Sequence, residues 1–446
     1  MAKNVLRQGL SSRHPSFDND RSLTSGEHDA PTISFVAASY SNCKCLFSYL
    51  VARNDAVRRV VFCCRPLGRN ERLDWPLSRS ATSLGCPGGR APNQGSTVYF
   101  PDTRSRDLTS PTGMRQALPI VAGVVAAAVV SALLNRWLAK KAELRNPPIG
   151  RFTTVEGVRL HYVERGTGTP LVLLHGNGSM IQDFQSSGLI DLAAKKYRVI
   201  AFDRPGFGHS DRPRSTIWTP EAQADLIAAA LEGIGVPRAI ILGHSWGTLV
   251  AIAFAVKYPH KVQALILASG YYYPKARADV VILSLPAIPV IGDLLSHTIS
   301  PLLSRLMWPL LLRKIFGPSQ VPTKFQGFPE EMAVRPSQIR ASAAETALMT
   351  PSVRTLWKKY SQLQMPVAII AGAEDRLIES EQSAQLSRDI PHSTLRSVSG
   401  TGHMVHQTAT AEVMSAIDMV AAENRRPVLA QAPPNREHLT PRAGRQ

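Results

Sequence analysis

The sequence predicts an α/β fold built on a mostly parallel, doubly wound sheet. Three observations lead to this. Short apolar stretches alternate with helical stretches between residues 148 and 422, which is typical of a parallel sheet covered on both faces. Polar clusters follow several of the predicted strands, where the site of such a sheet usually lies. One strand runs directly into Gly-x-Ser-x-Gly, residues 243–247.

The predicted elements follow a regular order after Asn146-Pro147-Pro148, which breaks the preceding helix. We expect strands over residues 152–155, 158–163, 171–174, 197–202, 239–243, 262–268, 367–371 and 393–398. We expect helices over residues 183–195, 219–233, 248–258, 380–388 and 409–422. Thr219 is the expected N-cap of the second helix, with Pro220 in its first turn.

The two ends of the chain differ in composition from this central part. Residues 1–113 are rich in Arg, Ser, Pro and Gly without lasting apolar periodicity, so we expect a disordered extension. Met114 would make a sensible start, and residues 1–113 then represent an upstream extension of the reading frame. All five cysteines (Cys43, Cys45, Cys63, Cys64 and Cys86) lie in this extension, with spacings that fit no zinc pattern. Residues 425–446 are Pro- and Arg-rich and are also expected to be disordered.

The expected domain organisation therefore has four parts. They are the extension 1–113, a membrane anchor with its basic flank at 114–145, a catalytic domain at 146–424 with a cap at about 274–364, and the tail 425–446. The net charge of +18 favours an anionic partner such as nucleic acid or a membrane surface. Because much of this charge lies in the two ends, and no stripe of interleaved aromatic and basic residues occurs, we expect no nucleic-acid partner.

Residues 118–134 are uncharged and just long enough to cross a bilayer. The richer basic flank is downstream (Arg136, Lys140, Lys141 and Arg145), which places the catalytic domain in the cytoplasm. Two alternatives remain. A signal peptide cleaved near residues 130–132 would make the enzyme secreted or periplasmic. A buried core helix would need no membrane.

Residues 240–247 have the form of a nucleophile elbow, in which a buried strand, a sharp turn and a helix follow one another. The turn needs small residues two positions before and after the nucleophile, and Gly243 and Gly247 meet that need. Ser245 then has its Oγ exposed above the sheet. The backbone N–H of Trp246 lies at the helix start, where it can face an oxyanion.

A serine hydroxyl needs a base in hydrogen-bond reach, and the base needs an orienting carboxylate. The chain offers Ser245, Asp375 and His403 in this order, each after a predicted strand. Glu374 is the alternative acid. His406 is the alternative base, but Gly402 places His403 in the loop.

These motifs resemble the α/β-hydrolase superfamily, in the branch of esterases, epoxide hydrolases, haloalkane dehalogenases and carbon–carbon hydrolases. The matching stretches are 175–178, 203–210, 243–247, 372–375 and 402–403. The resemblance implies a second oxyanion donor at Asn177, and a structural role for residues 203–210. It implies no metal and no organic cofactor.

The resemblance also bears on the reaction. Dehalogenases and epoxide hydrolases carry Asp at the elbow, whereas this chain has Ser245. We therefore expect hydrolysis of an ester, thioester or amide through an acyl-serine intermediate. The alternatives are carbon–carbon bond hydrolysis or acyl transfer with the same triad, and a non-catalytic binding protein on the same fold.

About ninety residues between Tyr273 and Met365 contain no core strand, and in this family a helical cap occupies the position. Helices are expected at 280–295, 301–316 and 339–349, the first two largely apolar. Their apolar side chains either pack the cap on the core, line a pocket for an apolar small molecule, or enter the bilayer beside the anchor. Every triad candidate follows Asn146, so we expect the catalytic domain to need nothing before it. The sequence assigns no oligomeric state.

Overall fold

The computed structural model describes residues 34–40, 43–49, 111–275 and 278–425. The chain divides into two units, residues 1–102 and 103–446, which are described separately. In the first unit, β1 (Ser34–Tyr40) and β2 (Cys43–Tyr49) form an antiparallel pair. This pair differs from the expected disorder, and both segments of the sequence contain Phe and Tyr, residue types that are frequent in strands. The other residues between 1 and 110, and the tail after Arg425, lie outside the described residues.

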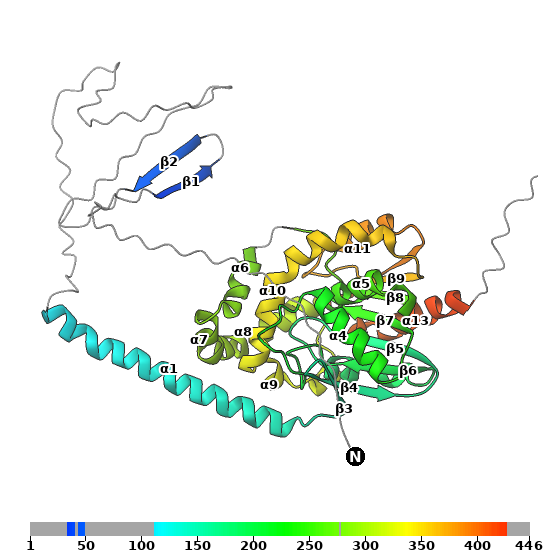
Figure 1. The fold of residues 1–446 in the computed structure, drawn as a ribbon, viewed down its shortest axis with the longest axis horizontal. Coiled ribbons are helices and arrows are strands. Elements are labelled where there is room, and N and C mark those ends of the chain that lie inside the picture. The colour runs from blue at the N-terminus through cyan, green and yellow to red at the C-terminus, as the bar shows by residue number, and fades with distance from the viewer. Residues whose placement is uncertain (1–33, 41–42, 50–110, 276–277, 426–446) are drawn as a thin grey trace, which may run out of the picture. The chain divides into compact units, whose positions relative to one another are not determined.

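The second unit contains an eight-stranded sheet in the order β10-β9-β8-β7-β5-β6-β4-β3 (Figure 1). Its strands are β3 (Arg151–Val155), β4 (Val158–Arg165), β5 (Thr169–Leu174), β6 (Tyr197–Phe202), β7 (Ala239–His244), β8 (Val262–Ala268), β9 (Val367–Gly372) and β10 (Ser393–Val398). The pairings of β4 with β3 and with β6 are antiparallel, and all the others are parallel. The predicted mostly parallel α/β fold is confirmed.

The core helices lie on both faces of this sheet. They are α2 (Ile181–Ser186), α3 (Leu189–Ala193), α4 (Pro220–Gly233), α5 (Gly247–Lys257), α11 (Ser380–Asp389), α12 (Val405–Thr408) and α13 (Thr410–Arg425). Side chains of α4, α5 and α11 share one apolar cluster with alternate strand residues, and those of α2, α3 and α13 share the other. The sheet is thus doubly wound.

One predicted helix, 183–195, is instead two short helices. Gly188 separates α2 from α3 and has a φ of 80°, a left-handed conformation that ends a helix and favours glycine. Ser187 is the C-cap of α2, and its Oγ accepts from the N–H of Leu189.

The cap is inserted between β8 and β9. It contains α6 (Ala278–Ser284), α7 (Ile291–His297), α8 (Ile299–Phe316), α9 (Glu330–Ala333) and α10 (Pro336–Leu356), with short 3-10 turns between and after them. The predicted helix 280–295 is divided by Pro286 and Pro289 into α6, a 3-10 turn and α7, bent by 91°. The longest cap helix, α10, contacts α6, α7 and α8 on one side and the core helix α5 on the other.

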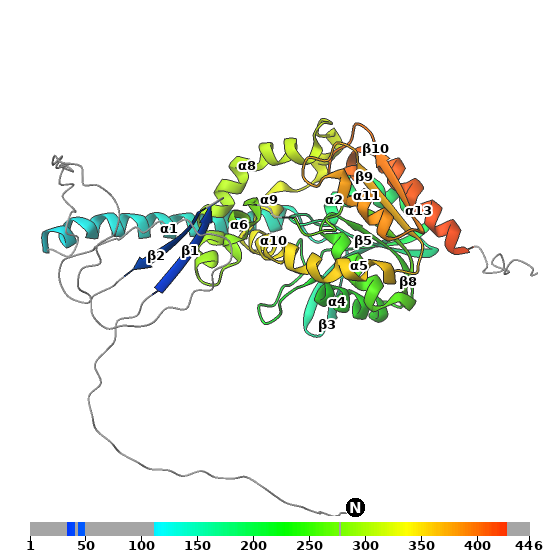
Figure 2. The ribbon, with the colours of Figure 1, turned by 90° about the horizontal axis from the view of Figure 1, so that it is seen from above.

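The helix α1 (Pro111–Arg145) precedes the sheet and begins slightly before Met114. Its stretch Leu118–Arg145 is 28 residues long and apolar enough to cross a membrane. The N-terminal part of α1 extends away from the sheet (Figure 2). Most of its apolar side chains are exposed, which does not fit a buried core helix. Its C-terminal half nevertheless contacts the cap, because Asn135 and Ala142 are buried and Glu143 pairs with Arg335. The expectation that the domain needs nothing before Asn146 therefore overlooked a packed segment.

Candidate active site

Ser245 lies at the sharp turn between β7 and α5, with a φ of 52° that is rare for a residue other than glycine. A Cβ at Gly243 would clash with the carbonyl oxygen of Gly247, and one at Gly247 would clash with the carbonyl oxygen of Leu174. Neither position can therefore hold a residue larger than glycine without a shift of the backbone. The turn holds Ser245 in a strained conformation above the sheet, as the motif predicted.

Three side chains from separate loops meet at this turn. Nε2 of His403 lies 2.9 Å from Oγ of Ser245, and Nδ1 of His403 lies 2.8 Å from Oδ2 of Asp375. The second carboxylate oxygen of Asp375 accepts hydrogen bonds from the N–H groups of Leu377 and Ile378. These bonds fix the carboxylate, which can in turn orient the imidazole. The structure thus brings together the three residues that the sequence singled out.

The alternative acid and base lie elsewhere. A carboxylate oxygen of Glu374 accepts from the N–H of Thr401, so this side chain braces the loop before His403. Nε2 of His406 lies 2.9 Å from Oδ1 of Asp183, and both side chains are buried. His406 is therefore directed away from Ser245.

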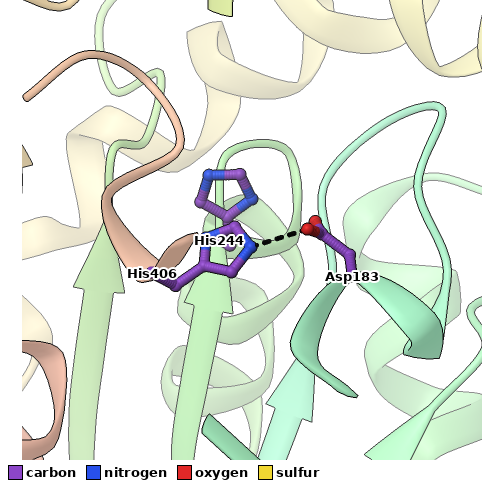
Figure 3. A group of neighbouring side chains, drawn as sticks. All are labelled: Asp183, His244 and His406. Atoms are coloured by element: carbon purple, nitrogen blue, oxygen red, sulfur yellow. Dashed lines mark ion pairs between the residues drawn. The ribbon is translucent and has the colours of Figure 1, made fainter. Parts of the chain in front are cut away.

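His406 belongs to a buried cluster with His244 and Asp183 (Figure 3). Nε2 of His244 lies 3.1 Å from the carbonyl oxygen of His403. The cluster therefore contacts the backbone of the loop that carries the candidate base. Burial, and then the neighbouring His406, lower the pKa of His244 well below its ordinary value. Burial would raise the pKa of Asp183, but the charge and hydrogen bond of His406 lower it.

The loop after β5 lies against the nucleophile, since a Cβ at Gly176 would be 3.0 Å from Cβ of Ser245. The side-chain amide of Asn177 donates to the carbonyl oxygen of Ser342 and to Oγ1 of Thr346, both on α10. Because this side chain is held by the cap, the group of Asn177 available to an oxyanion is its backbone N–H. Trp246 is the N-cap of α5, and its N–H has no partner within the helix.

Two further residues contact this loop, Arg204 and Glu345. Arg204 lies in the stretch 203–210 that was expected to be structural, whereas Glu345 was not singled out by the sequence. The guanidinium of Arg204 donates to the carbonyl oxygens of His175 and Gly176, and forms a fully buried ion pair with Glu345 of α10. Glu345 also accepts from Gln223, and its backbone carbonyl accepts from the indole N–H of Trp246. This network joins the loop, the nucleophile elbow and the cap. The sequence signal for Glu345 was a lone acidic residue in the predicted Ala-rich helix 339–349.

Residues 203–210 have the structural role that was expected. Oδ1 of Asp203 accepts from the N–H of Ile181, and Oδ2 accepts from that of His209 and lies 2.6 Å from Nδ1 of His161. The neighbouring cavity, of about 500 Å³, is lined by Arg212, Arg335 and Arg340 among others, and no triad candidate lines it. It is therefore separate from the site around Ser245.

Comparison with known proteins places this geometry in a family. The family model described as the alpha/beta hydrolase fold matches residues 169–410, more than half of the chain. This chain belongs to the α/β-hydrolase family. The match spans the predicted triad and both loops of the candidate oxyanion site.

Relatives of this α/β hydrolase are distant. It is 28% identical over 263 residues to the uncharacterized hydrolase YugF of Bacillus subtilis, covering 58% of this chain and 92% of the relative. It is 26% identical over 292 residues to a 2-hydroxy-6-oxo-2,4-heptadienoate hydrolase of Pseudomonas putida, covering 63% and 99%. A thermophilic esterase from Thermogutta terrifontis has the same fold, with a TM-score of 0.52 and 23% identity over 62% of this chain and 97% of that one.

Proposed function

We propose that this α/β hydrolase is a membrane-anchored serine hydrolase that cleaves an ester, thioester or amide of an apolar small molecule. An enzyme of this kind would be a carboxylesterase or a lipase-like enzyme. The observation that carries the proposal is the chain of contacts from Ser245 through His403 to Asp375 at the nucleophile elbow. No cofactor takes part in it.

In the acylation step, Oγ of Ser245 attacks the substrate carbonyl carbon while Nε2 of His403 takes the hydroxyl proton. Asp375 holds the imidazole by its Nδ1 and stabilises the imidazolium that forms. The negative charge on the substrate oxygen is stabilised by the backbone N–H groups of Asn177 and Trp246. The leaving alcohol, thiol or amine then takes the proton from His403, and an acyl-serine remains.

In the deacylation step, His403 takes a proton from water, and the resulting hydroxide attacks the acyl carbon. The bond to Ser245 Oγ breaks, its oxygen takes the proton back, and the carboxylic acid leaves. Acyl transfer would follow the same course with an alcohol in place of water.

The apolar character of the substrate is inferred from the cap. Side chains of α8, of α9 and of the segment between these two helices form an apolar cluster with Met180 and Met404, which follow the loops of Asn177 and His403 in the chain. The guanidinium of Arg204 lies over the ring of Trp246, but its charge is already paired with Glu345. It is therefore not available to bind an anionic group, which favours an uncharged substrate.

The membrane anchor is α1, by its length, composition and exposure. The basic residues after it favour a cytoplasmic catalytic domain. Ser131 and Asn135 bond to the cap within the same uninterrupted helix, which supports retention of this segment over cleavage near residues 130–132.

Carbon–carbon hydrolysis is the second candidate, because one relative is a hydrolase of 2-hydroxy-6-oxo-2,4-heptadienoate. That compound contains no ester or amide, so its hydrolysis must break a carbon–carbon bond. The two candidates are distinguished by supplying a series of p-nitrophenyl esters and this dienoate to the purified protein.

A fluorophosphonate probe tests the proposal as a whole. The probe should label the native chain and leave Ser245→Ala unlabelled, with turnover of p-nitrophenyl esters reduced by several powers of ten. Labelling of both proteins at another residue, or near-native turnover by Ser245→Ala, would remove Ser245 from its proposed role. An absence of labelling and turnover in the native chain would favour a non-catalytic binding protein.

A further inference from the structure

The cap carries an unusually apolar exposed surface on α6, α7 and α8, here called the cap face. Its members are aliphatic side chains that are each more than half exposed: Val281, Ile282, Leu283, Ile291, Leu294, Ile299, Leu303, Leu306 and Leu310. Soluble proteins rarely expose contiguous apolar patches of this kind without a partner.

On α8 the exposed residues form one stripe. Ile299, Leu303, Leu306 and Leu310 are spaced by four, three and four residues, so they lie on one side of the helix. Trp308, Leu312 and Phe316 face the apolar cluster of the cap instead. The helix is therefore apolar on its outer side as well as on its inner side, which cap packing alone does not require.

Charge is absent from this face. Asp293 is the only Asp, Glu, Lys or Arg between 280 and 304, and its carboxylate is turned toward Arg214 and Arg340, with which it pairs. The one histidine of this stretch, His297, has its Nδ1 2.8 Å from the backbone carbonyl oxygen of Asp293. The next charged group, Arg305, bonds to the side-chain oxygen of Asn135. Arg313 and Lys314 follow at the end of α8, where long basic side chains can reach lipid headgroups.

Polar contacts tie the cap face to α1. The hydroxyl of Ser131 and the amide of Asn135 both donate to the carbonyl oxygen of Thr298, at the junction of α7 and α8. Asn135 also donates to the carbonyl oxygen of His297 and is 1% exposed. These hydrogen bonds fix the junction of α7 and α8 beside residues 131–135 of α1.

The level of Asn135 on α1 matches the edge of the hydrocarbon core expected for a bilayer around this helix. Asn135 lies about 26 Å along the helix axis from Leu118, at 1.5 Å per residue, and a hydrocarbon core is about 30 Å thick. Trp137, Lys140 and Lys141 follow immediately, which is typical of the interface with water. Neither α6 nor α7, with seven residues each, is long enough to span the bilayer by itself. The bend of 91° between them suits a pair of helices that lies in the interface better than one that crosses the membrane.

We propose that the cap face is embedded in the interfacial region of the bilayer beside α1, and that the enzyme takes its ester from the membrane rather than from water. The occupant of the face is lipid. This rests on the proposed membrane anchor and on the proposed ester hydrolysis. The helix α10 connects the two sites, because it packs against α6, α7 and α8 and also bonds to Asn177 and Trp246 beside the nucleophile.

A fluorescent label tests the location without depending on activity. In the full chain with its five cysteines replaced by Ser, Leu306→Cys is labelled with nitrobenzoxadiazole and reconstituted in phosphatidylcholine vesicles, with or without brominated acyl chains. Leu395→Cys on β10, where the native side chain is 41% exposed, is the matched control. We expect blue-shifted emission and quenching by brominated lipid at position 306, and neither at position 395. Emission at 306 like that at 395, or a blue shift without quenching, which indicates a protein partner such as a second copy, would overturn the proposal.

A second pair of variants tests the route of the substrate. Leu303→Glu with Leu306→Glu should lower hydrolysis of a long-chain ester embedded in the vesicles by about tenfold or more, since charges enter lipid unfavourably. Hydrolysis of water-soluble p-nitrophenyl acetate should not change, and Leu395→Glu should change neither rate. Equal rates on the embedded ester would contradict membrane uptake. If the native chain cleaves no ester at all, the proposed reaction fails, while the label still decides the location of the cap face.

Discussion

Arg204 and Glu345 are separated by 141 residues in the chain and form a fully buried ion pair between the core and the cap. The guanidinium of Arg204 also donates to the carbonyl oxygens of His175 and Gly176. One side chain thus bonds both to the oxyanion loop and, through Glu345, to the cap helix α10. The position of the cap relative to the oxyanion loop therefore depends on an ion pair in which no triad residue takes part.

Replacing Glu345 by Gln should destabilise the protein substantially. The variant leaves the buried guanidinium of Arg204 without its counter-charge, and breaking a buried pair costs about 3–5 kcal/mol. We expect a clear fall in the thermal unfolding temperature of the full chain in detergent, with a lower kcat. The exposed pair of Lys275 and Glu379 provides the control, since Glu379→Gln should change little. An equal effect of the two variants would show that burial of the pair does not matter.

His403→Ala and His406→Gln should have opposite effects on turnover and stability. Removing His403 deprives Ser245 of its proposed base, so turnover should fall by several powers of ten while the fold is kept. Removing the imidazole of His406 leaves Asp183 buried without that partner, so the unfolding temperature should fall while most turnover is retained at low temperature. Parallel measurements of esterase activity and thermal unfolding on both variants are needed. The reverse ranking of activities would make His406 the base.

Stability should decrease as the pH falls below about 6.5, in part because of His175. Burial, and then Arg204, lower the pKa of His175 to about 3. Between its ordinary pKa of about 6.5 and that value, the unfolded chain binds a proton that the folded chain does not, so acid favours unfolding. One such group contributes at most about 1.4 kcal/mol per pH unit.

The variant His175→Asn isolates this contribution. Its unfolding temperature should be lower than that of the native chain at pH 7.5, because the hydrogen bond from the N–H of Arg204 is changed. The difference between the two proteins should narrow as the pH is lowered toward 4.5. A difference that is constant over this range would show that His175 does not titrate as expected.

Starting the chain at Asn146 should destabilise the cap as well as release the protein from membranes. The shortened chain lacks the amide of Asn135 that bonds to Thr298, and the carboxylate of Glu143 that pairs with Arg335. We expect it to be soluble, to retain some esterase activity, and to be cleaved faster by protease within residues 278–356 than a chain starting at Met114. Equal cleavage rates would show that α1 serves only as an anchor. Membrane-bound chains starting at Met114 should resist extraction by high salt and yield to detergent.

The nucleophile elbow and the succession of strands and helices along the chain could be predicted from sequence, because both depend on local patterns, whereas the order of the strands in the sheet was not predicted. The spacing of Gly243, Ser245 and Gly247 requires a sharp turn wherever it follows a buried strand. The period of the apolar residues gave the strands nearly to the residue. Division of the helix 183–195 at Gly188 was missed, since an isolated glycine does not decide between a helix and its end.

Only the tertiary structure decided how distant side chains meet. The sequence contains Glu345 in an Ala-rich helix and Asn135 at the end of an apolar run, but their partners are 141 and 163 residues away. His403 and His406 are three residues apart in the chain, yet one faces Ser245 and the other Asp183. Such pairings depend on the packing of whole elements, which sets the distance and orientation between side chains, whereas a sequence motif constrains only the backbone around it.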